Sequence, residues 1–273
     1  MDEICRGFEE AKGRAMSIPE FKKKKNGIPI ISKDEMDRLG EALVADFCPE
    51  ALEQPMRLDI DRFIRDYLGM SMDYKRLSNN GVYLGMTVFC DSDMVPVYDA
   101  VKKEADFISV EAGTVLIEKS LTSKLDLPRY RYTAAHEAGH GFLHSVYFTQ
   151  NAGSAAARAQ NGEAVIRCRI ESLNLPRQKE WTDNDWMEWQ ADRFASALLM
   201  PRHAVLDLLA KDKTERDEFW AAKSILSVAQ TFAVSKQAAE IRLRDVGALK
   251  GFTNADLDYG MSFFPGQRRI RSK

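Results

Sequence analysis

The sequence of 273 residues predicts an α+β fold that is mainly helical, with a small antiparallel sheet and a C-terminal helical region. Apolar residues recur at helical spacing over long stretches, short β-like runs cluster in one part of the chain, and capping signals mark helix starts. The composition is globular, with 45% hydrophobic and 29% charged residues. A formal net charge of -2 gives no support for a general nucleic-acid binder, so direct nucleic-acid binding is not expected.

Two helices are predicted in the first part of the chain. Ser32 and Glu35 form a capping-box pattern, which predicts a helix over residues 33–47. A second helix is expected after Pro55, and Gly69 should end it because glycine readily adopts the left-handed conformation.

Short strands are expected next, and these should form the antiparallel sheet. Four runs rich in β-branched and aromatic residues lie at 83–89, 94–98, 106–110 and 114–118. Residues 111–114 contain glycine and predict a hairpin turn that joins the last two strands.

The second half of the chain is predicted to be largely helical. The expected elements are a helix at 129–147, a polar loop at 149–163, a strand at 164–170, a helix at 184–200 and mostly helical chain at 203–248. Thr182 or Asp183 can cap the helix predicted at 184–200, and Pro201 ends that helix. The predicted organisation is a peripheral segment at 1–30, which includes a solvated run of four lysines, a core domain at 31–211, and a helical region at 212–273 with a short basic tail.

The chain is expected to be soluble and cytoplasmic. Its N-terminus has no apolar core of a secretory signal, and no stretch approaches the roughly 18–20 apolar residues of a membrane span. The four cysteines lie far apart in the sequence, without a C-x-x-C pair, which favours reduced thiols over a cysteine metal site.

The segment His136-Glu137-Ala138-Gly139-His140 has the H-E-x-x-H pattern. Residues four apart lie on one face of a helix, so His136 and His140 can bind one metal ion. Glu137 lies beside that site and can act as the general base that accepts a proton from water. The chain has only four histidines, so chance placement explains the pattern poorly. Zn2+ is the expected ion, although manganese or iron suits the same residue types.

A third metal ligand must come from elsewhere in the chain. The extended motif with a third histidine fails, because Phe142 and Val146 occupy the positions that need glycine and histidine. Glu188 is the best candidate, with Asp192 four residues later in a supporting role on a histidine ring N–H. Two alternatives remain: Asp192 is the ligand and Glu188 is exposed, or both are a solvated acidic pair.

Two further histidines have less certain roles. His144 is four residues beyond His140, and we interpret it as a substrate-side or packing residue and not as a ligand, because successive four-residue steps drift around a helix. His203 is expected at the surface or in packing, with a transition-state donor as the alternative.

Three stretches of the chain resemble the ImmA/IrrE family of metallopeptidases, and they lie at 129–140, 188–201 and 226–235. The resemblance covers residues 55–246 and implies a zincin-like core with a gluzincin-like site. The family's two histidines and its glutamate ligand correspond to His136, His140 and Glu188, and its general base corresponds to Glu137. Tyr132, which lies in the first stretch, is a further candidate substrate-side residue.

The resemblance also implies a biological setting. Members of the family are typically bacterial or phage-borne cytoplasmic proteins that act on helix-turn-helix repressors or antitoxin-like partners. The segment at 145–182 is longer than in a compact member and can form a lid or a partner-binding insertion. A toxin role in a toxin–antitoxin pair is a related expectation.

The expected function is therefore zinc-dependent cleavage of a peptide bond in a specific intracellular protein, such as a transcriptional regulator encoded nearby. The alternative is a non-proteolytic metal-binding protein that sequesters a repressor or binds DNA. The junction at 234–235 could belong to a DNA-reading helix pair, but the apolar spacing favours helices that complete the core. The residues expected to be buried there are Ile225, Val228, Phe232, Ile241 and Leu243.

Overall fold

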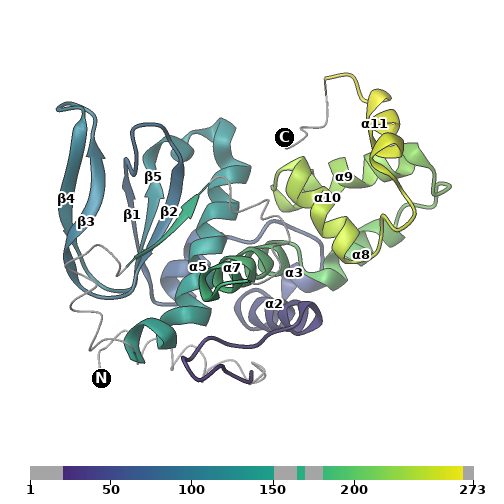
Figure 1. The fold of residues 1–273 in the computed structure, drawn as a ribbon. Coiled ribbons are helices and arrows are strands. Elements are labelled where there is room, and N and C mark those ends of the chain that lie inside the picture. The colour runs from purple at the N-terminus through teal and green to yellow at the C-terminus, as the bar shows by residue number, and fades with distance from the viewer. Residues whose placement is uncertain (1–20, 151–164, 170–180, 267–273) are drawn as a thin grey trace.

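The computed structural model describes residues 21–150, 165–169 and 181–266. Helices dominate, and they pack beside a small sheet and a separate two-stranded sheet, so the α+β prediction is confirmed (Figure 1). Most of the predicted polar loop and the basic tail at Arg268, Arg269 and Arg271 lie outside the described residues.

The larger sheet has four strands in the order β1-β5-β2-β6. Their bounds are β1 Ser71–Lys75, β2 Tyr83–Val88, β5 Thr114–Glu118 and β6 Val165–Arg169. β1 pairs with β5 in parallel, whereas β2 pairs antiparallel with both β5 and β6. The expected antiparallel pairing is present in this sheet, but β1, which was not foreseen, adds a parallel pair and makes the sheet mixed.

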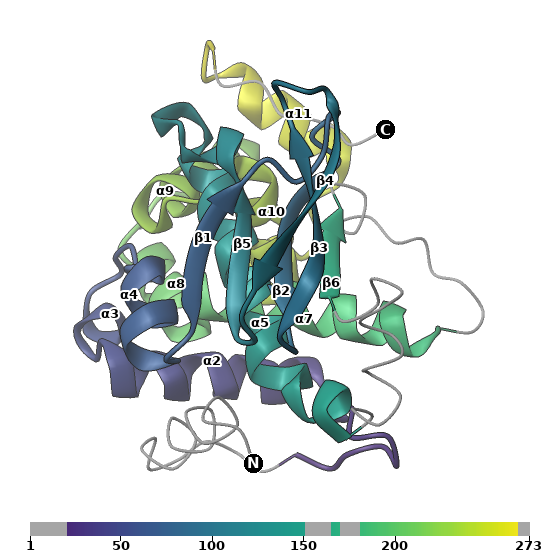
Figure 2. The same ribbon diagram turned by 90° about the vertical axis from the view of Figure 1, so that its left-hand side faces the viewer.

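The second sheet is a hairpin of β3 (Ser92–Asp99) and β4 (Glu104–Val110). Figure 2 shows this hairpin in front of the larger sheet, with α5 and α7 behind it. The predicted hairpin between the last two strands is wrong, since β4 pairs with β3 and β5 lies between β1 and β2. The turn with Gly113, whose φ is 76°, instead carries the chain from one sheet to the other.

The helices largely follow the predicted ranges. They are α2 Lys33–Phe47, α3 Glu50–Glu53, α4 Ile60–Arg62 with a π-helical turn at Phe63–Tyr67, α5 Leu127–Gln150, α7 Asp183–Leu199, α8 Arg202–Ala210, α9 Glu218–Phe232, α10 Lys236–Asp245 and α11 Asn254–Ser262. The capping box of Ser32 and Glu35 is present, and Thr182 caps α7 through Asp185. The short α11, in a part of the chain expected to be a tail, was not predicted.

The long helix α5 packs on the sheet through β2 and β5 and on α7 at its other side. Two glycines permit these close approaches. A Cβ added at Gly85 in β2 would lie 2.5 Å from Glu137 Oε1, and one added at Gly139 would lie 3.0 Å from the ring of Phe194. Small residues at these contacts therefore bring the centre of α5 against both neighbours.

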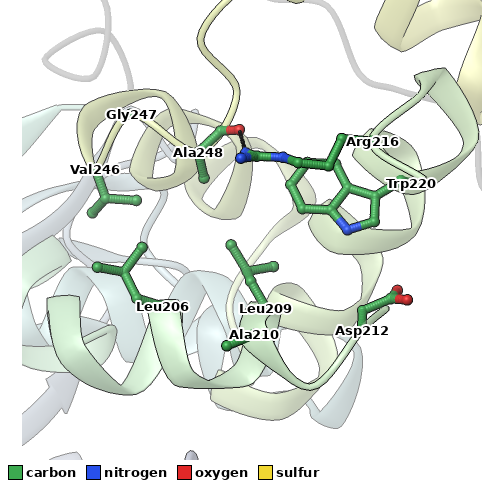
Figure 3. A pocket seen from close by; sticks show the side chains of 9 residues that line it. All are labelled: Leu206, Leu209, Ala210, Asp212, Arg216, Trp220, Val246, Gly247 and Ala248. Carbon is green, nitrogen blue, oxygen red and sulfur yellow. Dashed lines mark hydrogen bonds between the residues drawn. The ribbon is translucent and has the colours of Figure 1, made fainter. Parts of the chain in front are cut away.

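The C-terminal helices continue the main hydrophobic core, which includes buried side chains from α2 to α11. Of the five residues expected to be buried here, four are buried, whereas Ile241 is 40% exposed. A pocket of about 390 Å³ lies between α8 and the segment after α10 (Figure 3). At its rim the Arg216 guanidinium lies over the Trp220 ring and donates to the Ala248 carbonyl. This contact joins the start of α9 to the chain after α10.

The N-terminal segment, residues 21–31, packs on α7, whereas three of its four lysines, Lys22, Lys23 and Lys25, are exposed as expected of a solvated run. Lys24 Nζ lies 2.7 Å from Asp183 Oδ1, and Asn26 donates to the same carboxylate at 2.6 Å. Ile28 is fully buried. Among the helices of the described residues, none combines the length and the apolar character needed to cross a membrane.

Candidate metal centre

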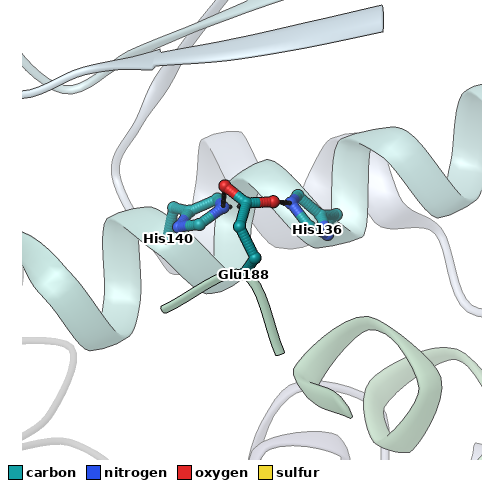
Figure 4. Close-up of side chains that lie close together, drawn as sticks. All are labelled: His136, His140 and Glu188. Atoms are coloured by element: carbon teal, nitrogen blue, oxygen red, sulfur yellow. Dashed lines mark hydrogen bonds and ion pairs between the residues drawn. The ribbon is translucent and has the colours of Figure 1, made fainter. Parts of the chain in front are cut away.

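Two helices bring three side chains to one point. His136 and His140 lie one turn apart on α5, and Glu188 reaches them from α7 (Figure 4). The two Nε2 atoms are 3.0 Å apart. Glu188 Oε2 lies 3.4 Å from Nε2 of His136, and Glu188 Oε1 lies 3.5 Å from Nε2 of His140. All three residues are buried.

These separations suit one metal ion. Ligand atoms about 2.0–2.1 Å from a tetrahedral zinc ion lie roughly 3.3 Å from one another. The separation of the two Nε2 atoms, 3.0 Å, is close to that value, and Glu188 brings one of its two oxygens to each ring, at 3.4 and 3.5 Å. Two imidazoles and one carboxylate are also a donor set that zinc accepts, and a catalytic site keeps its fourth position free of protein ligands.

Asp192 contacts the His136 ring at Nδ1. Its Oδ1 lies 2.8 Å from His136 Nδ1, on the edge of the ring opposite Nε2. A carboxylate there accepts the Nδ1 proton and leaves Nε2 with a lone pair for a metal. Burial raises the pKa of Asp192, and the hydrogen bond from His136 opposes that rise. The geometry thus favours Glu188 as the ligand over the alternative with Asp192, since Glu188 is only 6% exposed and faces both rings.

His140 contacts a neutral side chain, His144, instead of a carboxylate. Its Nδ1 lies 3.0 Å from His144 Nδ1, and His144 Nε2 lies 2.9 Å from Gln190 Oε1. Burial lowers the pKa of His144 to about 4, and it lowers the pKa of His140 well below its usual value. His144 is fully buried. Of the two roles expected for His144, its burial against His140 fits the packing role.

The carboxylate of Glu137 is held by the sheet. Thr87 Oγ1 in β2 lies 2.5 Å from Glu137 Oε2, to which it donates, and 3.0 Å from the Glu137 carbonyl oxygen. Glu137 is fully buried, and Gly85 leaves the space that its side chain occupies. The carboxylate of the general-base candidate is thus held against β2 by Thr87 and Gly85.

The remaining candidates lie at the edge of this group or away from it. Tyr132 donates its hydroxyl to the Asp192 carbonyl at 3.1 Å, which links α5 to α7 one turn before His136. His203 is exposed at the start of α8, where its backbone N–H donates to Glu41. The structure does not bring His203 to the metal group.

Sequence reasoning missed four residues of the site: Gly85, Thr87, Gly139 and Gln190. Gly139 carried a signal, because a glycine inside a helix usually has a packing reason. Gly85 carried a similar signal within a strand, where glycine often marks a close approach of another element. Thr87 and Gln190 carried none, since only the three-dimensional arrangement brings them to Glu137 and His144.

The comparison with protein families identifies residues 120–244 as an IrrE N-terminal-like domain of the peptidase M78 family. The chain therefore carries an IrrE N-terminal-like domain. This supports the resemblance seen in the sequence, and it makes the buried histidine–glutamate group the candidate metal site of a metallopeptidase. The comparison with curated proteins gave no match.

The matched domain contains the three candidate ligands and Glu137, but not the whole site. Gly85 and Thr87, which border Glu137, come from β2 before residue 120. Pro29, whose carbonyl accepts from Gln190 at 2.6 Å, also precedes the IrrE N-terminal-like domain. Residues outside the domain therefore contact Glu137 directly, and they reach His140 through Gln190 and His144.

Proposed function

We propose that this protein is a zinc-dependent metalloendopeptidase that cleaves one specific intracellular protein. The observation that carries the proposal is the buried group of His136, His140 and Glu188, with Glu137 next to His136 in the chain and buried against β2. A site that only stabilised the fold would need no such base, and structural zinc sites are usually closed by four protein ligands.

The chain's residues divide the chemistry between them. His136, His140 and Glu188 would hold the ion, which supplies a Lewis acid that polarises the peptide carbonyl and favours deprotonation of water. Glu137 accepts a proton from the attacking water and later delivers it to the leaving amine. Thr87 keeps the Glu137 carboxylate in place through the 2.5 Å hydrogen bond. Burial excludes bulk water, which strengthens each of these electrostatic interactions.

The substrate we propose is a helix-turn-helix repressor or an antitoxin-like regulator, encoded near this protein and present in the same cytoplasm. Its support is the resemblance of residues 129–140 and 188–201 to the ImmA/IrrE family, whose members act on such partners. The role in a toxin–antitoxin pair or a mobile element belongs to the same proposal.

The test uses Glu137→Gln, which removes the base while keeping the shape of the side chain. Wild-type protein and the variant are each co-expressed with the product of the adjacent gene, and the partner is examined by mass spectrometry. We expect a single cleavage with the wild-type protein, and an uncleaved partner that co-purifies with the variant. The variant should bind zinc as the wild-type protein does. Cleavage by Glu137→Gln at the wild-type rate would exclude the mechanism.

A second comparison separates the peptidase from the non-proteolytic regulator. Glu137→Gln and His136→Ala are introduced singly into the host, and the activity of the regulated promoter is measured. A peptidase loses its cellular effect in both variants. A binding protein keeps its effect in Glu137→Gln and loses it only when the metal residue is replaced.

A further inference from the structure

A line of buried hydrogen bonds leads from His140 to the N-terminal segment. His140 Nδ1 lies 3.0 Å from His144 Nδ1, and His144 Nε2 lies 2.9 Å from Gln190 Oε1. Gln190 Nε2 then donates to the Pro29 carbonyl at 2.6 Å. The three side chains are at most 2% exposed, so water does not compete for these contacts.

The direction of each hydrogen bond follows from one condition at the metal site. If His140 offers the Nε2 lone pair to a metal, the proton of its neutral ring is on Nδ1. That proton is donated to His144 Nδ1, so His144 carries its own proton on Nε2 and donates it to Gln190 Oε1. The Gln190 amide group is then oriented with its Nε2 towards the Pro29 carbonyl. Each hydrogen bond between these groups thus has one donor and one acceptor.

The Pro29 carbonyl, which accepts the last of these hydrogen bonds, is held in place by its neighbours in the N-terminal segment. Lys24 and Asn26 both contact the Asp183 carboxylate near the start of α7, at 2.7 and 2.6 Å. Ile28 is fully buried directly before Pro29. The Pro29 carbonyl is therefore a fixed acceptor, although it lies about 110 residues before His140 in the sequence.

We propose that His144, Gln190 and the Pro29 carbonyl position the His140 ring for metal binding, so that the N-terminal segment contributes to metal affinity. The proposal rests on the metal-dependent function proposed above. The two histidines are then oriented by different groups. The Asp192 carboxylate orients the His136 ring, and a series of hydrogen-bonded neutral groups orients the His140 ring.

The first test measures zinc affinity by competition with a chromophoric chelator, using the full chain. His144→Leu removes the acceptor for His140 Nδ1, whereas His144→Asn can retain an acceptor oxygen near the same position. Replacing groups that orient a metal ligand lowers affinity about 10- to 100-fold, and we expect that loss for His144→Leu. His144→Asn should recover most of the affinity. Phe142→Leu is the matched control, because it removes buried volume on the same helix and should leave the affinity unchanged.

A second pair of variants keeps the test decisive if His144→Leu does not fold. Gln190→Met keeps the length of the side chain but removes both of its hydrogen bonds, and Asp183→Ala releases Lys24 and Asn26. Both should lower zinc affinity, with the smaller effect in Asp183→Ala. The visible spectrum of the cobalt-loaded protein should change in Gln190→Met, because the His140 ring changes its orientation.

The two proposals fail in different ways. Wild-type affinity in folded His144→Leu and Gln190→Met would overturn the positioning role, whatever the protein cleaves. Equal losses in His144→Leu and His144→Asn, with Phe142→Leu unaffected, would also overturn it, since the acceptor would then be irrelevant. A wild-type protein that binds zinc but cleaves no partner would instead contradict the peptidase and leave the affinity measurements valid.

Discussion

Thr87 Oγ1 lies 2.5 Å from Glu137 Oε2, so a strand of the sheet holds the carboxylate that we propose as the general base. Thr87 is 1% exposed, and the contact is shielded from water. The sheet therefore does more than cover α5: it fixes the direction in which Glu137 points.

Replacing Thr87 by valine keeps the shape of the side chain but removes its hydroxyl. A hydrogen bond to a charged group contributes about 1.5–3 kcal/mol. Loss of that bond should lower kcat roughly 10- to 100-fold, because Glu137 is no longer held in place. Thr87→Ser retains the hydroxyl and should stay close to wild type. The measurement is the rate of partner cleavage at saturating substrate, and equal rates for the valine and serine variants would contradict the role of the hydroxyl.

The two acidic residues of α7 should differ in their effect on zinc binding. Glu188→Ala removes a candidate ligand, whereas Asp192→Ala removes the carboxylate that contacts His136 Nδ1. We expect a loss of about 10- to 100-fold for Asp192→Ala and a larger loss for Glu188→Ala. Competition with a chelator, measured on both purified variants, shows which variant loses more zinc affinity. The reverse order would favour Asp192 as the ligand.

The metal-free protein should lose stability as the pH falls from about 6.5 to about 4. Burial lowers the pKa of His144 to about 4 in the folded state, so the unfolded chain binds more protons in this range. One pKa unit corresponds to about 1.4 kcal/mol, which gives about 2 kcal/mol less stability at pH 5 than at pH 7. Burial of His140 acts in the same direction. Urea unfolding in the presence of a chelator measures this difference.

Two variants identify the source of this pH dependence. His144→Asn removes the titrating group and should flatten the change between pH 7 and pH 5. His203→Asn alters an exposed histidine and should leave the change as in the wild-type protein. Identical profiles for all three proteins would show that His144 does not contribute.

Ala233→Gly should stabilise the protein. Ala233 ends α9 in the left-handed conformation, with φ of 52°, which is unfavourable for a residue with a Cβ. Glycine adopts this conformation without that strain, so a gain of about 0.5–1 kcal/mol is expected. Ala238→Gly in α10 is the control and should destabilise by a similar amount, because its backbone is helical. Thermal unfolding of the two variants should thus shift in opposite directions.

The helices and the two candidate histidine ligands could be predicted because their signals are local. Ser32 and Glu35 form the capping box within one turn, and His136 and His140 share a helix face at a spacing of four. Predicting that Glu188 joins the two histidines required a second motif, which lies on another helix. Its place in the site could be inferred only as the best of several carboxylates.

The strand pairing could not be predicted, because it depends on contacts between distant parts of the chain. The turn at Gly113 has the glycine of a hairpin, yet it joins two different sheets. The actual hairpin turns at Lys103, which has φ of 59° and no glycine to mark it. In the same way, nothing near Gln190 in sequence indicates that it meets His144 and Pro29.

The candidate ligands stand on α5 and α7, two packed helices whose approach is set by Gly139 against the ring of Phe194. Helix backbones pressed together this closely have little freedom to rearrange. The chelating atoms are therefore already near their final separations before an ion arrives, and metal uptake should involve little reorganisation energy. Loading and removal of the ion would then leave the backbone unchanged, so the rate of exchange is set by how the ion reaches a buried site and not by folding around it.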